Sequence, residues 1–194
     1  MLDLSRPLDD KLILDDQIYP LNLSFDIVLK VFELLRDKSI PDVIKPFMII
    51  NMFTGVDFAN KLTLEEAIEI YQAILDEHIL DNASEDVVRD ISGNIIPLPK
   101  KESDDKQEKR NYSLRYDSDY IYASFLQAYN IDLFEAQGKL HWKKFNALIT
   151  GLPKDTKLSE VIQIRSWKPS KGESSEYKRY MRELQREYEL PPEE

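Results

Sequence analysis

Apolar side chains recur at the spacing of α-helices along most of the chain. The first clear stripe follows Ser24, which can cap a helix, and consists of Phe25, Val28, Leu29, Phe32 and Leu35. A second helix is expected to begin at Pro41, and Pro46 is expected to kink or divide it. The third follows a capping-box sequence at 63–66, and its stripe is Leu64, Ala67, Ile68, Tyr71 and Leu75. These patterns favour a mainly helical fold.

The residues before the first helix have a different pattern. The segments 11–14 (KLIL) and 17–23 (QIYPLNL) are short apolar runs on either side of Asp15 and Asp16. Aspartate is common in tight turns, and two short runs joined by two turn residues are typical of a hairpin. The sequence therefore predicts a short N-terminal β-hairpin.

The stretch KLHWKKFNALITGLP, residues 139–153, contains the most aromatic helical pattern of the second half. One face carries Trp142, Phe145, Leu148, Ile149 and Leu152. Lys143 and Lys144 lie on the other face, which is typical of a helix with one buried side. Gly151 is expected to end this helix in the left-handed conformation, and Pro153 prevents its continuation.

Three further helices are predicted in the second half. One begins at Asp117 or Ser118, either of which can act as its cap. Another begins at Asp155 or Thr156. A polar helix from about 174 to 188 carries only a narrow apolar stripe, which is typical of a helix with a single contact side.

A block of charge separates the two halves of the chain. Nine of the eleven residues 100–110 are charged and none is apolar, so this block cannot bury enough surface to offset its ordering entropy. We predict a mobile charged linker over 97–115. The expected domains are then 1–96, a hairpin plus helices; 116–169, an aromatic-rich helical core; and 170–194, a polar C-terminal helix.

The charge balance argues against a nucleic-acid partner. The net charge is −10, and residues 1–99 carry 8 basic and 19 acidic side chains, whereas residues 111–194 carry 13 of each. The acidic half would repel a phosphate backbone. The sequence KLHWKK does combine lysines with an aromatic residue, but Trp142 belongs to the apolar stripe and the lysines to the opposite face. No nucleic acid is expected as a partner.

Composition also indicates the compartment. The chain has no cysteine, which fits the reducing cytoplasm. No apolar run approaches the roughly 20 residues that span a bilayer, and the first ten residues lack the order of a secretory signal. We expect a cytoplasmic protein without a membrane partner.

The sequence offers little for catalysis. It has two histidines: His78 closes a helix, where it can interact with the helix dipole, and His141 adjoins Trp142. A packed, hydrogen-bonded role is favoured for His141 over a catalytic one. The chain contains no glycine-rich phosphate loop and no nucleophile elbow. No catalytic residue, cofactor or metal is therefore predicted, and an interaction protein is favoured over an enzyme.

One compound pattern within residues 116–169 points to a family. It consists of Tyr116-Asp117, Ile121-Tyr122-Ala123 with Phe125, Tyr129 with Ile131-Asp132-Leu133, Leu140-His141-Trp142, Phe145 with Leu148, and Arg165. This pattern resembles the hallmark region of the bacteriophage gene product fifteen family, and the first half of the chain resembles the family more loosely. Ser118 and Lys143 depart from it, at positions where the family more often has an aromatic residue.

The resemblance implies a tail assembly chaperone without catalytic activity. Its expected partners are the tape measure protein, the major tail protein and further copies of itself. Its expected place is the cytoplasm of the host cell, and we expect it to be absent from the mature virion. Two alternatives stay open: a structural tail or connector component of the virion, and a small metal-dependent enzyme that uses His141 with Asp117 or Asp132.

The residues expected to bind the partner cannot be separated from core residues by sequence, because both kinds lie on apolar stripes. The combined set is Phe125, Tyr129, Leu140, His141, Trp142, Phe145, Leu148, Ile162 and Arg165.

Overall fold

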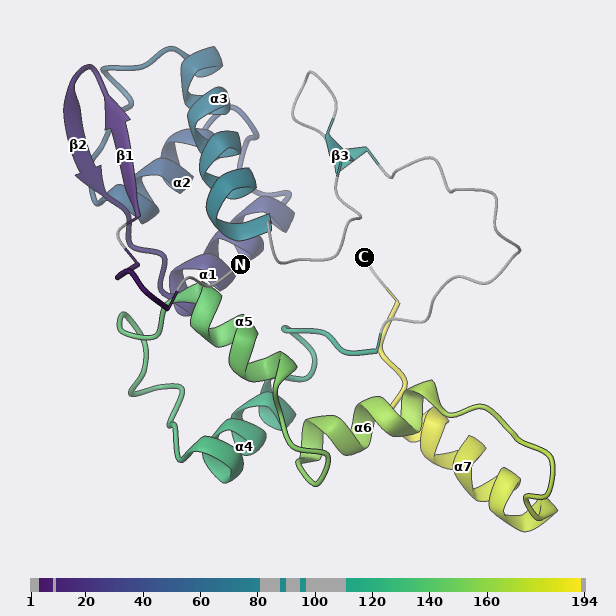
Figure 1. The fold of residues 1–194 in the computed structure, drawn as a ribbon. Coiled ribbons are helices and arrows are strands. Elements are labelled where there is room, and N and C mark those ends of the chain that lie inside the picture. Colours follow the sequence, from purple (N-terminus) through teal and green to yellow (C-terminus); the bar gives the residue numbers. More distant parts are fainter. Residues whose placement is uncertain (1–3, 9, 81–87, 90–94, 97–110, 193–194) are drawn as a thin grey trace. The chain divides into compact units, whose positions relative to one another are not determined.

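The computed structural model of the chain describes residues 4–8, 10–80, 88–89, 95–96 and 111–192. Helices make up most of this structure, and a two-stranded hairpin lies near the N-terminus (Figure 1). The mainly helical fold and the hairpin are therefore confirmed. The chain forms two compact units, one of Met1–Lys101 with Gln137–Ala147 and the other of Glu102–Ala136 with Leu148–Glu194.

The hairpin consists of strand β1 (Lys11–Leu14) and strand β2 (Gln17–Pro20), which pair antiparallel. Asp15 and Asp16 form the turn, and both have left-handed backbones with φ of 48° and 59°. Two successive left-handed residues are typical of the turn whose twist matches that of paired strands. The predicted turn residues are thus the observed ones.

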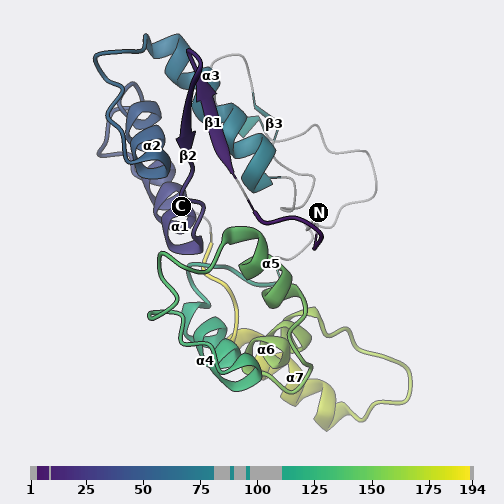
Figure 2. The same cartoon turned by 60° about the vertical axis from the view of Figure 1, so that its left-hand side comes forward.

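Three helices and a π-helical turn build the rest of the first unit. They are α1 (Phe25–Arg36), α2 (Lys45–Thr54), α3 (Leu64–Ile74) and η1 (Leu75–Ile79). The hairpin lies alongside α3 (Figure 2), and the ring of Tyr19 meets that of Phe58 edge-on at 5.2 Å. The fully buried side chains of this unit include Val28, Val31, Ile49, Phe53 and Leu75.

Helix α2 begins four residues later than predicted. Residues 41–44 form a turn, and the helix starts at Lys45, so that Pro46 lies in its first turn. The first N–H groups of a helix have no partner within it, so a proline there removes no hydrogen bond. Pro46 therefore neither kinks nor divides the helix, and the prediction from Pro41 is wrong.

Helix α3 begins with the predicted capping box. The Thr63 hydroxyl accepts a hydrogen bond from the Glu66 N–H at 3.3 Å, and the Glu66 carboxylate accepts one from the Thr63 N–H at 2.8 Å. Two otherwise unpaired donors of the first turn are satisfied by these reciprocal bonds.

The segment Gln137–Ala147 belongs to the first unit, although the sequence pattern grouped it with the helices of the second half. The Phe25 N–H donates to the Leu140 carbonyl at 2.9 Å, and the Trp142 N–H donates to the Leu23 carbonyl at 2.8 Å. These two bonds attach the segment to the start of α1. A sequence pattern cannot show this attachment, because the residues involved are more than 100 positions apart.

The second unit contains α4 (Ser118–Tyr129), α6 (Lys157–Ser166) and α7 (Ser175–Glu187), close to the predicted ranges. In the interior, the Leu158 N–H donates to the buried Ser124 hydroxyl at 2.9 Å and so ties α6 to α4.

Helix α5 (Trp142–Thr150) begins in the first unit, and its last residues belong to the second. It ends where the pattern predicted, but not in the predicted way. The left-handed glycines of the described chain are Gly55, Gly138 and Gly172, so Gly151 does not end α5 in that conformation.

Two short strands were not predicted: β3 (Val88–Arg89) pairs antiparallel with β4 (Ile95–Ile96). Residues 97–110, which include most of the predicted charged linker, lie outside the described residues. In the part of the chain that the structure describes, no helix is both long and apolar enough to cross a membrane.

Candidate functional site

The predicted site residues are divided between the two units. Leu140, His141, Trp142 and Phe145 belong to the first, and Phe125, Tyr129, Leu148, Ile162 and Arg165 to the second. Among the large aromatics, Trp142, Phe145 and Phe125 are 2%, 1% and 0% exposed. These three side chains form core, and a surface for a partner must be built from other residues.

An aromatic stack explains the pattern at 139–153. The Phe145 ring is stacked on Phe25, with centroids 5.0 Å apart, and on Trp142 at 5.7 Å. The ring of Phe32 meets Trp142 edge-on at 5.7 Å. The indole N–H of Trp142 donates to the Ile79 carbonyl at 3.3 Å, which satisfies its one buried polar group. The tryptophan is therefore a structural anchor of the first unit.

Both histidines of the chain bind one carboxylate, that of Asp10. The Nδ1 atom of His78 lies 2.9 Å from Asp10 Oδ1, and the Nε2 atom of His141 lies 2.7 Å from Asp10 Oδ2. The side chains of Asp10, His78 and His141 are all largely buried. This cluster joins the residue before β1, the η1 turn and the residue before α5.

The protonation of the cluster follows from its hydrogen bonds. The Nδ1 atom of His141 accepts a bond from the Lys143 N–H at 3.1 Å, so its Nε2 carries the proton that is donated to Asp10. The hydrogen bonds from His141 and His78 hold the pKa of Asp10 well below its ordinary range, although burial opposes this effect. Asp10 is thus an ionised, largely buried carboxylate that fixes three segments.

This geometry bears on the predicted roles of the histidines. His78 does lie at the end of a helix, but its close partner is Asp10. The acids considered as partners of His141 have other contacts: Asp117 binds Arg165, and Asp132 accepts a hydrogen bond from Tyr122. Within the described ranges, no group of three or more histidine, aspartate or glutamate side chains is arranged to hold a metal ion.

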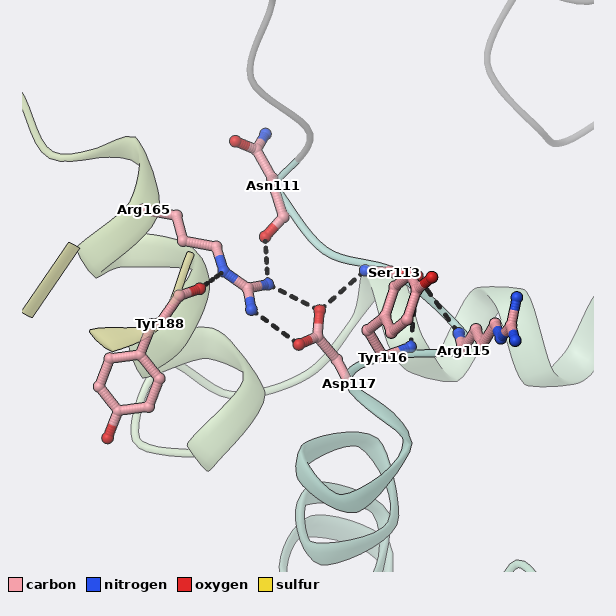
Figure 3. A network of polar contacts seen from close by, with 7 residues as sticks. All are labelled: Asn111, Ser113, Arg115, Tyr116, Asp117, Arg165 and Tyr188. Atoms are coloured by element: carbon pink, nitrogen blue, oxygen red, sulfur yellow. Dashed lines mark hydrogen bonds and ion pairs between the residues drawn. The ribbon is translucent and has the colours of Figure 1, made fainter. Parts of the chain in front are cut away.

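A second buried carboxylate, Asp117, organises the second unit (Figure 3). Arg165 donates two hydrogen bonds to it, at 2.6 and 2.7 Å, and their side chains are 8% and 1% exposed. The Ser113 N–H donates to the same carboxylate at 2.8 Å. Arg165 also donates to the carbonyls of Tyr188 at 2.6 Å and Asn111 at 3.2 Å. The guanidinium therefore connects α6 to the residues before α4 and to the residue after α7.

The predicted capping role of Asp117 is only partly right. Asp117 does hold the N-cap position of α4, but its side chain makes no capping hydrogen bond. Both of its oxygens are engaged by Arg165, which satisfies the buried charge better than a backbone N–H alone could. The family pattern contains both residues, but nothing in the sequence shows that they pair, because they are 48 positions apart.

The second unit also presents an apolar surface that the sequence pattern does not reveal. Phe134 is 73% exposed and Leu126 is 41% exposed. The Phe134 ring lies 5.4 Å from that of Tyr122, whose hydroxyl donates to Asp132 at 3.1 Å. That hydrogen bond raises the pKa of Tyr122. An aspartate two residues before an aromatic, directly after the end of a helix, was the available local signal for such a turn.

Residues 8–190 match the model of a protein family described as Bacteriophage Gp15 protein. The chain belongs to this family. The resemblance inferred from the compound pattern is confirmed, and the Gp15 family is not a known enzyme family. A search of curated proteins and a search of solved structures each found no significant match to the chain.

The residues that made the Gp15 family recognisable are ones whose contacts fix the fold. Asp117 and Arg165 form the buried ion pair, and Tyr122 is hydrogen-bonded to Asp132. His141 binds the carboxylate that also holds His78. The pattern therefore describes a scaffold, and a partner can contact only the side chains that this scaffold exposes.

Proposed function

We propose that this Gp15 family protein is a tail assembly chaperone. It binds the tape measure protein, the major tail protein or both while the phage tail is built, and it catalyses no reaction. The match to the Gp15 family over residues 8–190 carries the proposal, because the family resemblance implies a gene in the tail-morphogenesis region. In this role the protein acts in the host cytoplasm and is absent from the finished particle.

The exposed apolar side chains support such a role. In the first unit they include Ile13, Ile18, Val43 and Ile44, and in the second Leu126 and Phe134. A tape measure presents long helical apolar surface that would aggregate alone, and a helix can lie against a complementary apolar surface. Several modest contacts give useful total affinity and still allow release as tail subunits polymerise.

Co-expression tests the proposal directly. The tape measure protein should be largely insoluble when expressed alone and should become soluble when this protein is present, because its apolar helices are then covered. Affinity capture of the tagged chain should recover the tape measure protein or the major tail protein. If solubility is unchanged and capture recovers neither protein, the chaperone role is wrong. An unrelated acidic helical protein of similar size serves as the control.

Mass spectrometry of purified particles separates the chaperone from a structural tail or connector component. A chaperone should be absent from the virion, whereas a component should be present in a fixed number of copies. The metal-dependent alternative has less support, because His141 is committed to Asp10 and to the Lys143 N–H. Self-association, the remaining predicted interaction, can be measured by sedimentation velocity.

A further inference from the structure

We propose that the surface formed by Tyr122, Ala123, Leu126 and Phe134, here called the Phe134 surface, binds an amphipathic helix whose polar residues are basic. This inference extends the proposed chaperone role. It rests on that role only in taking the tape measure protein as the natural partner. The shape, the preorganisation and the charge of the surface all suit such a helix.

The Phe134 surface is held in place by one carboxylate. Asp132 Oδ1 accepts the Phe134 N–H at 2.8 Å and the Glu135 N–H at 3.3 Å, while Oδ2 accepts the Tyr122 hydroxyl at 3.1 Å. These bonds fix the backbone that carries Phe134 and the hydroxyl of Tyr122, and the two rings lie against each other with centroids 5.4 Å apart. A side chain that is already ordered loses little entropy on binding, so its burial contributes more of its free energy to affinity.

The shape of the surface suits a helix. Tyr122 and Leu126 lie one turn apart on α4 and therefore on the same face of it. Ala123, three residues before Leu126, is exposed beside this face, and its short side chain lets a partner approach the backbone of α4 closely. Side chains spaced three or four residues apart on a partner helix can contact Leu126, Tyr122 and Phe134 in turn.

The charge around the surface selects the partner. Residues 116–138 contain no lysine, arginine or histidine. Asp119 and Glu135 are exposed, whereas Asp117 is neutralised by Arg165. Phosphate backbones and anionic lipid surfaces would be repelled here, and lysine or arginine residues beside an apolar stripe would be attracted. The occupant that fits is thus a basic amphipathic helix.

A synthetic peptide tests this assignment on the full-length chain. The probe is a fluorescein-labelled helical peptide of about 18 residues (five helical turns), with leucines on one face and lysines on the other. Its matched control replaces every lysine by glutamate. Fluorescence anisotropy should show that the lysine peptide binds at least about tenfold more tightly than the glutamate peptide, because rim charges steer and orient the partner.

Variants locate the binding on the chain. Phe134→Ala should weaken binding of the lysine peptide by at least about fivefold, because exposed, preorganised aromatics dominate interface energies. Asp119→Asn combined with Glu135→Gln should reduce the preference for lysine over glutamate. Tyr180→Ala, which removes an aromatic that is 54% exposed on α7, is the matched control and should leave binding unchanged. Circular dichroism should show that all variants are folded.

Equal binding by wild type and Phe134→Ala, or equal binding of the two peptides, would overturn the assignment. So would sedimentation data in which Phe134→Ala abolishes self-association, since a second copy would then occupy the surface. Capture of the tape measure protein separates the two proposals. If wild type and Phe134→Ala capture the tape measure protein equally, the Phe134 surface is not its binding site and the chaperone role stands. If wild type binds the lysine peptide through Phe134 but captures no tail protein, the surface stands and the chaperone role fails.

Discussion

At the scale of single residues, hydrogen-bonded carboxylates join distant segments of each unit, among them the largely buried Asp10 in the first unit and the fully buried Asp117 in the second. Asp10 accepts hydrogen bonds from two histidines, and Asp117 forms a bidentate ion pair with Arg165. A buried carboxylate is costly unless it is paired and hydrogen-bonded. The stability of each unit should therefore depend on these partners more than on any surface charge.

The Asp117–Arg165 pair gives a prediction about stability. Arg165→Met leaves the carboxylate buried with only the Ser113 N–H, and breaking such a pair typically costs about 3–5 kcal/mol. Urea unfolding followed by circular dichroism should show this loss. The double variant Asp117→Leu with Arg165→Met should be more stable than Arg165→Met alone, because no unpaired charge is left. Arg179→Met, on the exposed side of α7, should change stability by less than about 0.5 kcal/mol.

Asp10 gives a prediction about pH. Its pKa is lower in the folded than in the unfolded chain, so ionised Asp10 stabilises the fold above the ordinary aspartate pKa of about 4. This stabilisation is lost as the pH falls from that value toward the lower folded pKa. The difference in unfolding free energy between wild type and Asp10→Asn should thus be at its maximum at pH 6 and should decrease steadily below about pH 5. A difference that is constant from pH 6 to pH 3 would contradict the role of the histidine bonds.

At the scale of elements, a helix end or turn can be predicted from sequence when its hydrogen bonds join residues close together in the chain. The capping box of α3 was read correctly because all of its bonds join residues within one turn. The turn of the hairpin was read correctly for the same reason. The predicted start of α2 was wrong, because Pro41 and Pro46 can each occupy the first turn of a helix and the neighbouring residues do not show which of them does.

The capping box can be tested by removing its hydroxyl. Thr63→Ala should lower the free energy of unfolding by about 1 kcal/mol, which is typical of the loss of an N-cap side chain. Thr63→Ser keeps the hydroxyl and should stay close to wild type. Thermal unfolding of both variants gives the comparison, and equal losses would mean that the threonine methyl group, rather than the capping bond, stabilises the helix.

At the scale of the whole molecule, the units are not continuous stretches of sequence. The segment Gln137–Ala147 returns to the first unit and supplies the ring of Phe145 to Phe25 and that of Trp142 to Phe32. It also supplies His141 to Asp10. The first unit thus depends on residues that lie beyond the predicted N-terminal domain.

A truncated chain tests this dependence. A fragment of residues 1–96, the domain predicted from sequence, lacks the segment and should expose the apolar side chains that Trp142 and Phe145 cover. It should bind a hydrophobic dye and unfold without a cooperative transition. A fragment of residues 1–150 contains Trp142 as its single tryptophan and should show the blue-shifted emission of a buried indole. Cooperative unfolding of the 1–96 fragment would show that the segment is dispensable.

The sequence by itself determined the helical class, the hairpin and its turn, and most of the helix positions, because these depend on neighbours within a few residues. It also determined the family, since the compound pattern records the residues that hold the scaffold. Only the tertiary structure decided that Asp117 meets Arg165, that Asp10 joins both histidines, and that Phe134 stays exposed while Phe145 is buried. Apolar side chains look alike in sequence, and their burial depends on which distant segments the folded chain brings against them.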